Sequence, residues 1–260
     1  MIPRAAITFW SRQAPWPNRD QVEQDLVLSR LIVEIASHRV LRDELVFRGG
    51  TCLHKVHLPQ PRRYSEDLDY VRASHGPIGP ILTALRDIAA NLGMEVKTKV
   101  GSFPKVFLRS PFESGSRRMR IKIEMNTYET SPARPYLRLP FSVESPWWSG
   151  STDILTFELA ELTSTKLHAL YQRRRGRDLF DLWLALTVME LEPDEILACF
   201  APYRPNGYTS ATAIANLQNH VTDQLFRSDL HTLVADQIGY NIEEAADFVI
   251  EQLLSRIDQF

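Results

Sequence analysis

The sequence predicts an α+β fold, with strands and helices mixed through about residue 157 and helices alone after it. Alternating apolar and polar residues mark strands in the first part, and residues 119–125 are the clearest example. Apolar residues at three- and four-residue steps mark helices in both parts. We therefore expect two domains, residues 1–157 and residues 158–260, the second entirely helical.

The composition is that of an ordinary globular protein. The chain has 260 residues, 30 Lys and Arg, 32 Asp and Glu, a formal charge of −2 and 44% hydrophobic residues. Only Cys52 and Cys199 are present, and Gly and Pro follow no period, which excludes disulfide scaffolds and collagen. The apolar runs are too short to span a membrane, and the first residues lack the apolar core of a signal peptide. We expect a cytoplasmic protein with no membrane partner.

The near-neutral charge hides an uneven distribution. Residues 1–180 carry 27 basic and 19 acidic side chains, net +8, whereas residues 181–260 carry 3 and 13, net −10. Of the 30 cations 24 are Arg, whose planar guanidinium holds phosphate well. The basic part is therefore compatible with a polyphosphate or nucleic-acid partner, although a solvated arginine-rich surface explains the composition equally well.

The first elements suggest a phosphate-binding turn. Residues 20–38 form an amphipathic helix, with Asp20 as the expected N-cap. A short strand at 45–47 runs into Gly49-Gly50, and a second helix begins at about Thr51. A strand, a glycine turn and a helix N-terminus in succession commonly hold phosphate.

The next segment predicts a strand over residues 64–71, in which Asp67 and Asp69 share one face. A helix follows over 81–92 and ends at Gly93. Strands are expected at 94–100, 104–109 and 119–125, the last with Glu124 on its polar face. The Pro-rich residues 132–146 are expected to be irregular, and a short strand should follow at 154–157.

The second part reads as helices throughout. A long helix is expected over 158–172, a break at 173–176 and a further helix over 178–189. Residues 193–260 then give several acidic helices joined by short loops.

Two groups of residues could carry chemistry. Asp67 and Asp69 can share divalent cations, and Glu124 on another strand would complete a two-metal site. An Asp-x-Asp pair alone is more often a solvated strand edge, but the Gly49-Gly50-Thr51 turn ahead of it favours a nucleoside triphosphate site.

The second group lies in the helical part. Lys166 could neutralise a triphosphate, while Asp181 or Asp178 orients Lys166 or accepts hydrogen bonds from the nucleotide. The alternative is structural, because Arg174 with Asp178 and Arg177 with Asp181 stand at the i,i+4 spacing of helix salt bridges.

Four blocks of sequence together resemble one family. Residues 47–55, 63–69, 166–170 and 177–183 are similar in order and spacing to the AbiEii/AbiGii nucleotidyltransferase toxin family, relatives of the MenT toxins, over roughly residues 20–190. The resemblance implies a polymerase-beta-like core with a mixed sheet, joined to a helical lobe that contributes Lys166 and Asp181 to the site. It further implies an NTP substrate, Mg²⁺ or alternatively Mn²⁺, and a toxin–antitoxin or phage-defence pair.

The resemblance also assigns roles to residues. Catalysis falls to Asp67, Asp69, Lys166 and Asp181, nucleotide binding to Gly49, Gly50, Thr51, Ser65, Lys166 and Asp178, and metal binding to Asp67, Asp69 and Glu124. The expected reaction moves an NMP from an NTP to RNA, such as the 3′ end of tRNA, and so blocks translation. The expected partners are this RNA and a cognate antitoxin protein. The residues expected to follow RNA phosphates are Arg62, Arg63, Arg117, Arg118, Arg120 and residues 173–177.

Two alternatives stay open. A manganese-dependent glycosyltransferase would use the Asp67-x-Asp69 pair, and a non-catalytic RNA-binding protein could keep a transferase core. A zinc site at His54, His57 and His168 is disfavoured because no Cys or carboxylate joins them at ligand spacing. Trp147 and Trp148 either stack on bases or fill a gap between the two lobes.

Overall fold

The structure is a computed structural model that describes residues 2–58, 60–115, 117–128, 131–234 and 239–260. The chain divides into two compact units. The sheet unit comprises residues 1–130 and 136–157, and the helical unit comprises residues 131–135 and 158–260. Within the described ranges, no helix is long and apolar enough to cross a membrane.

The sheet unit is built on a mixed sheet, to which the described residues contribute seven strands in the order β3-β4-β5-β2-β1-β7-β6. The strands are β1 (Leu45–Arg48), β2 (Asp67–Arg72), β3 (Glu95–Lys99), β4 (Lys105–Pro111), β5 (Arg118–Asn126), β6 (Leu137–Glu144) and β7 (Ser149–Thr156). β1 pairs with β7 and β2 with β5 in parallel, and the other neighbours are antiparallel. The predicted α+β class is confirmed.

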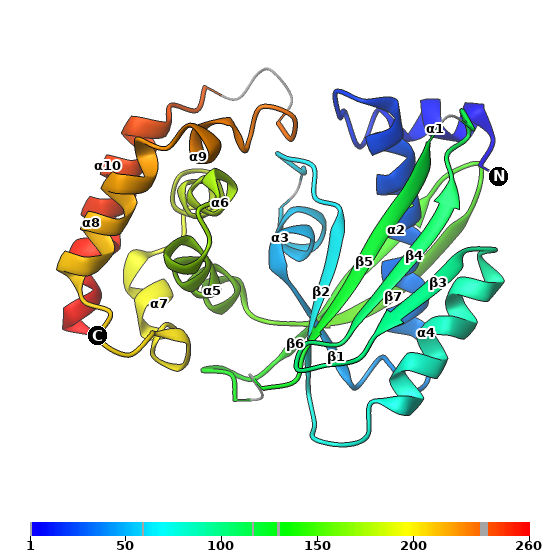
Figure 1. Cartoon of the computed structure of the whole chain (residues 1–260), viewed down its shortest axis with the longest axis horizontal. Coiled ribbons are helices and arrows are strands. Elements are labelled where there is room, and N and C mark those ends of the chain that lie inside the picture. The colour runs from blue at the N-terminus through cyan, green and yellow to red at the C-terminus, as the bar shows by residue number, and fades with distance from the viewer. Residues whose placement is uncertain (1, 59, 116, 129–130, 235–238) are drawn as a thin grey trace. The chain divides into compact units, whose positions relative to one another are not determined.

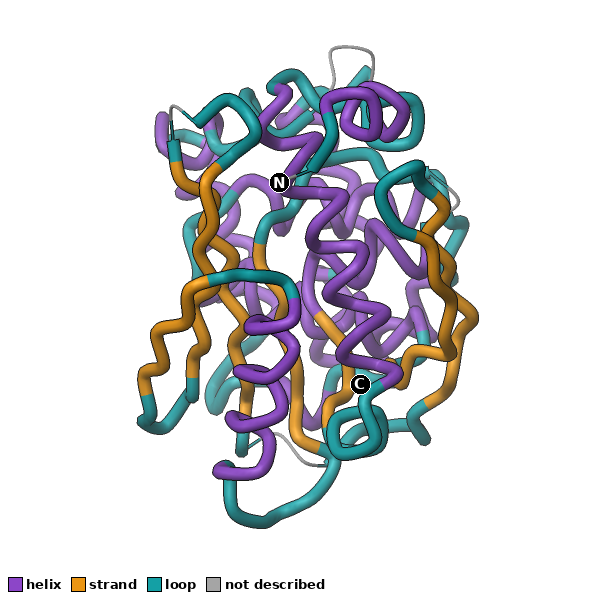
Figure 2. Tube along the Cα trace, turned by 90° about the vertical axis from the view of Figure 1, so that its right-hand side faces the viewer, coloured by secondary structure: helices purple, strands orange, loops and turns teal. Residues whose placement is uncertain are grey.

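Two helices cover one face of this sheet. α2 (Arg19–Ser37) packs on β5, β6 and β7, and α4 (Gly79–Asn91) packs on β3 and β4. Both lie on the same side of the strands in Figure 1, and the view from that side shows the purple helices in front of the orange sheet (Figure 2). The alternating apolar residues predicted in β5 face these helices, and all four are almost fully buried: Met119, Ile121, Ile123 and Met125. The polar side chains of β5 therefore lie on the opposite face.

Most element boundaries agree with the sequence, and the differences have local causes. Asn18, not Asp20, caps α2, because its side chain accepts from the Asp20 amide while Gln21 completes the capping box. Gly93 follows α4 with φ +65°, as expected of a residue that ends a helix. The irregular segment predicted at 132–146 is wrong over β6. This strand tolerates Pro140 because it is the edge strand, where a missing N–H breaks no ladder on its free side.

The helical unit contains α5 (Leu159–Gln172), α6 (Gly176–Thr187), α7 (Pro193–Ala198), α8 (Ser210–Val221), α9 (Gln224–Ser228) and α10 (Ile242–Gln252), with short 3-10 turns η2 (Ala201–Tyr203) and η3 (Leu254–Gln259). α6 begins two residues before the predicted start. A Cβ on Gly176 would lie 2.3 Å from the Phe226 carbonyl oxygen, so only glycine allows this close approach. The predicted succession of helices is confirmed for the described residues.

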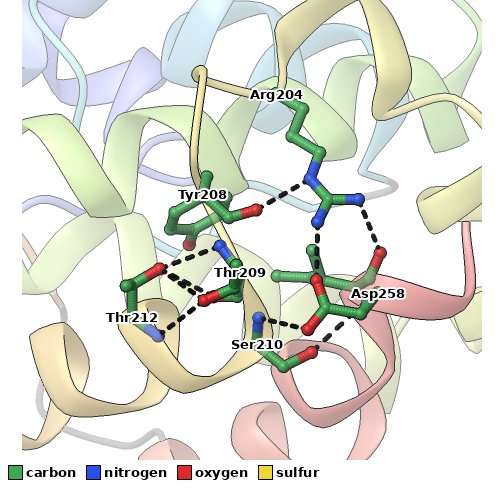
Figure 3. A network of polar contacts seen from close by, with 7 residues as sticks. Arg204, Tyr208, Thr209, Ser210, Thr212 and Asp258 are labelled. Atoms are coloured by element: carbon green, nitrogen blue, oxygen red, sulfur yellow. Dashed lines mark hydrogen bonds and ion pairs between the residues drawn. The ribbon is translucent and has the colours of Figure 1, made fainter.

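A polar network fastens the end of the helical unit (Figure 3). Arg204 donates from Nε to the Tyr208 carbonyl oxygen (2.8 Å) and from Nη2 to Asp258 Oδ1 (2.6 Å). The second oxygen of Asp258 accepts from the Ser210 amide (3.0 Å), at the start of α8. The guanidinium thus ties the loop before α8 to η3, beside a cavity of about 410 Å³ that Phe200 and Ile257 help to line.

Candidate active site

The pairing of β2 with β5 brings three carboxylates together. Asp69 stands opposite Glu124 in the register, and Asp67 stands opposite Lys122. Residues paired across strands project to the same face, and so do residues two positions apart on one strand. Asp67, Asp69 and Glu124, called here the carboxylate row, therefore share the sheet face that is turned away from α2 and α4.

Two lysines neutralise the carboxylate row. Lys122 Nζ lies 3.0 Å from Asp67 Oδ2 and 2.9 Å from Glu124 Oε2, and Lys105 Nζ lies 3.2 Å from Glu124 Oε1. Burial disfavours the charged form of Glu124, but Lys122 and Lys105 outweigh it and lower the pKa of the carboxyl. Burial likewise opposes the charge on Lys122, yet Asp67 and Glu124 raise its pKa. Glu124 and Lys122 therefore each favour the charged form of the other.

The glycine turn lies directly against this row. β1 leads into the short helix α3 (Gly49–Cys52), which continues as one π-helical turn, η1 (Leu53–His57). Gly49 has φ +82°, and a Cβ on it would lie 2.6 Å from Asp69 Oδ2. A Cβ on Gly50 would lie 2.3 Å from Arg63 Nη2. Gly49 is needed because its φ is positive and its backbone packs against Asp69, whereas a side chain on Gly50 would have to displace the Arg63 guanidinium.

Thr51 and Ser65 fasten the turn to β2. The Thr51 hydroxyl donates to the Asp67 carbonyl oxygen (2.5 Å) and lies 2.8 Å from Ser65 Oγ. On β7, Thr156 Oγ1 donates to the Phe47 carbonyl oxygen (2.8 Å) and lies 3.1 Å from Cys52 Sγ. The predicted nucleotide-binding residues Gly49, Gly50, Thr51 and Ser65 are thus brought beside Asp67 and Asp69.

A buried ionic network behind the turn was missed by sequence reasoning. Asp25 of α2 accepts from Lys55 Nζ (2.7 Å), and from the indole N–H groups of Trp10 (2.8 Å) and Trp16 (2.9 Å). Lys55 belongs to η1, so this network fixes the turn relative to α2. The signal in the sequence was Asp25 itself, a charged residue among the apolar positions of a core-facing helix.

The chemistry of the carboxylate row fits a divalent cation. Among the residues that the structure describes, no group of three His, Cys, Asp or Glu side chains has the spacing of a metal site. The row nevertheless offers carboxylate oxygens from two adjacent strands, the donors that Mg²⁺ prefers, and the Lys122 ammonium already bridges two of them as a cation. The predicted metal ligands are therefore neighbours, arranged around an ammonium.

The second predicted group forms an ion-pair cluster within the helical unit. Lys166 on α5 lies 2.6 Å from Asp181 and 3.5 Å from Asp178, both on α6. All three side chains are at least 92% buried, with exposed fractions of 8%, 0% and 3%. Both aspartates contact Lys166, and Arg177, the salt-bridge partner considered for Asp181, lies 3.8 Å from Asp229.

Four of the residues expected to follow RNA phosphates have partners within the sheet unit. Arg63 is buried and donates from Nη1 to the Tyr64 carbonyl oxygen (3.2 Å), so it is not a surface contact. Arg117 pairs with Asp20 (2.7 Å), and Arg118 pairs with Glu95 (2.5 Å). The Arg120 guanidinium lies 4.6 Å from the centre of the Phe107 ring.

The tryptophans and histidines also have local partners. The Arg30 guanidinium of α2 lies 4.9 Å from the Trp147 ring centre and 5.1 Å from the Trp148 ring centre, a contact within the sheet unit. His54 Nδ1 accepts from the Arg62 amide (3.2 Å). Burial lowers the pKa of His57 to about 4, which keeps this imidazole neutral.

Solved structures share the fold of the whole chain. The protein JHP933 from Helicobacter pylori is 15% identical with a TM-score of 0.53, over 94% of this chain and 95% of that one. A second H. pylori protein, described as a candidate nucleotidyltransferase, is 16% identical with a TM-score of 0.54, over 93% and 98%. MenT4, a nucleotidyltransferase toxin from Mycobacterium tuberculosis H37Rv, is 17% identical with a TM-score of 0.52, over 96% and 98%. The comparison with curated proteins found no match.

The chain thus has the fold of a nucleotidyltransferase. The family described as "Nucleotidyl transferase AbiEii toxin, Type IV TA system" matches residues 30–252, and the chain belongs to this family. The resemblance drawn from the four sequence blocks is confirmed. The protein is a nucleotidyltransferase enzyme of a toxin–antitoxin family, which implies an NTP substrate, a divalent metal ion and an antitoxin partner.

Proposed function

We propose that this enzyme transfers a nucleoside monophosphate from an NTP to an RNA, such as the 3′ end of tRNA, and thereby blocks translation. The observation that carries the proposal is the register between β2 and β5, which sets Asp69 beside Glu124, together with the Gly49 turn that packs against Asp69. Carboxylates next to a backbone turn suit a triphosphate with its metal ions. The family assignment favours this reading over a glycosyltransferase or a non-catalytic protein.

Asp67, Asp69 and Glu124 would hold the metal ions. Bound there, Mg²⁺ would activate the acceptor hydroxyl and stabilise charge on the phosphates. In the reaction a bond forms between the acceptor oxygen and the α-phosphorus, the bond from that phosphorus to pyrophosphate breaks, and the hydroxyl proton is released. Gly49 and Gly50 let the backbone approach the phosphates, and Thr51 keeps this turn fixed to β2.

The helical unit supplies the second part of the proposal. By its motif, Lys166 is assigned to the triphosphate, and Asp181 holds the ammonium in place through the shorter of its two ion pairs. Asp178 makes the longer contact, and its Oδ2 is buried without a hydrogen-bond partner in the described part of the chain.

Labelled NTPs test the proposal. The purified protein, incubated with Mg²⁺, total RNA and one α-labelled NTP at a time, should label RNA. Asp69→Asn should reduce labelling at least about 100-fold, because it removes a carboxylate that would hold the metal ions on which stabilisation of the developing phosphate charge depends. Asp153→Asn, an exposed aspartate on β7, is the matched control and should keep full labelling.

The same variants show whether growth arrest in a host comes from the enzymatic activity or from overexpression of any folded protein. The wild-type protein and Asp153→Asn should arrest growth of a host, whereas Asp69→Asn should not, with all three folded by circular dichroism. RNA labelling that survives in Asp69→Asn, or transfer only from nucleotide sugars, contradicts the proposal.

A further inference from the structure

The sheet face that carries the carboxylate row continues outward as a basic surface. The register extends from Asp69 and Glu124 to Lys105 on β4 and Lys99 on β3. The neighbouring row runs from Asp67 and Lys122 to Phe107 and Lys97. The basic strip, as it is called here, consists of Lys97, Lys99, Lys105, Phe107, Arg109 and Arg120.

The charge of this face is strongly one-sided. Every residue of β3, β4 and β5 is described, and on this face they carry seven cations against two carboxylates, Glu95 and Glu124. Arg118 pairs with Glu95, while Lys105 and Lys122 share Glu124. The cations that extend farthest from the carboxylate row, Lys97 and Lys99, are exposed.

Two pairs of like charges lie directly across strands. Lys99 stands opposite Lys105, and Arg109 stands opposite Arg120. Like charges in such positions destabilise a sheet. An anionic ligand that lies across the strands would reduce this repulsion.

Aromatic side chains accompany the cations. Phe107 is half-buried on the polar face of β4, with the Arg120 guanidinium 4.6 Å from its ring centre. At the end of the strands, Phe103 and Tyr128 meet edge-to-face at 5.6 Å and remain 46% and 64% exposed. Cations along a backbone path, with aromatic faces beside them, are typical of surfaces that bind single-stranded nucleic acid.

We propose that the basic strip binds the single-stranded end of the RNA acceptor and leads its 3′ hydroxyl to the carboxylate row. The inference rests on the proposed function, since it takes the acceptor to be RNA. The path from β2 to β3 crosses three strand spacings, about 14 Å. The strip therefore holds the last few nucleotides, with phosphates on Lys97, Lys99 and Arg109 and a base against Phe107.

Binding measured without catalysis tests this inference. The probe is a fluorescent 12-nucleotide single-stranded RNA with a free 3′ hydroxyl, in EDTA and without nucleotide. The triple variant Lys97→Gln/Lys99→Gln/Arg109→Gln should bind about tenfold more weakly or worse, with the slope of log K against log salt reduced by about 2. Phe107→Leu should weaken binding while leaving that slope unchanged.

A second triple variant provides the control. Arg12→Gln/Arg39→Gln/Arg86→Gln removes the same charge from exposed positions outside the strands and should bind like the wild type. The inference is overturned if both triple variants bind the probe as tightly as the wild type. It is also overturned if both weaken binding to the same extent. If the wild type binds the probe through the strip but labels no RNA with any NTP, the proposed function fails while the binding surface stands.

Discussion

The two ionic groups of the molecule differ in how much water reaches them. In the sheet unit, Asp67, Lys122 and Glu124 keep 36%, 27% and 25% of their side-chain surface exposed. In the helical unit, Asp181 is fully buried and Lys166 is 8% exposed. In the partly solvated group water screens each ion pair, so removing a lysine costs little stability, whereas the buried group loses stability when either member is removed.

The geometry of the strand carboxylates could be predicted from the sequence, whereas that of the helical aspartates could not. Period-two alternation fixes which face of a strand a carboxylate occupies, so Asp67, Asp69 and Glu124 could be placed from sequence. The helix period does not say which neighbour a helical aspartate meets, because that depends on how α5 and α6 pack. The sequence therefore does not show which aspartate lies nearer Lys166, which in the structure is Asp181, at 2.6 Å against 3.5 Å for Asp178.

The largest effect is expected from Asp181→Asn. Removing this carboxylate leaves the Lys166 ammonium buried with only the longer contact to Asp178. Such a change should lower the free energy of unfolding by about 3–5 kcal/mol. Urea unfolding followed by circular dichroism measures it.

Asp178→Asn is the paired control and should cost clearly less, because it keeps the 2.6 Å contact. The double variant Lys166→Met/Asp181→Leu should recover stability, since apolar residues remove both buried charges. Equal losses of stability in Asp178→Asn and Asp181→Asn would mean that the shorter Lys166–Asp181 ion pair does not stabilise the helical unit more than the longer contact does.

A smaller effect concerns acid stability of the sheet unit, which has its own buried titratable group. The pKa of His57 is lowered by burial to about 4, below the value near 6.5 of the unfolded chain. The stability that neutral His57 contributes is complete above pH 6.5 and is lost as the pH falls towards 4. At pH 5 the free energy of unfolding should be about 2 kcal/mol lower than at high pH for this reason. His57→Gln should remove this loss, as seen in unfolding curves at pH 7.5 and pH 5.

His75→Gln replaces an exposed histidine and should leave the pH dependence of the wild type intact. If His57→Gln and His75→Gln lose the same stability on acidification, the acid sensitivity of the sheet unit lies elsewhere.

Long-range features of the fold could not be obtained from local patterns. Of the strands in the described part of the chain, β6 was missed and β7 was predicted only over 154–157, although it begins at Ser149. β6 was missed because Pro140 signals irregular backbone unless the strand is known to lie at an edge. The Asp25–Lys55 pair joins residues 30 positions apart, and the Lys122 bridge depends on the β2–β5 register. The sequence did show Lys122 and Glu124 on one polar face, but not which strand would lie beside them.

The smallest effect is expected from Lys122→Gln, which tests the partly solvated ionic group of the sheet unit. The change removes the bridge between Asp67 and Glu124, but water reaches all three groups, so the free energy of unfolding at pH 7 should fall by no more than about 1 kcal/mol.

The pH dependence makes this last test specific to the carboxylate row. The lowered pKa of Glu124 contributes stability above its ordinary value of 4.5, and this contribution is lost as the pH falls through the lower folded value. Without Lys122 the pKa of Glu124 should rise towards 4.5, and less stability should be lost on acidification. Lys97→Gln, which lies outside the bridge, should leave the acid limb of the unfolding curve unchanged. A loss at pH 7 as large as that of Asp181→Asn would mean that the row is a structural ion pair, and that its lysine does not give way to a metal ion at low energetic cost.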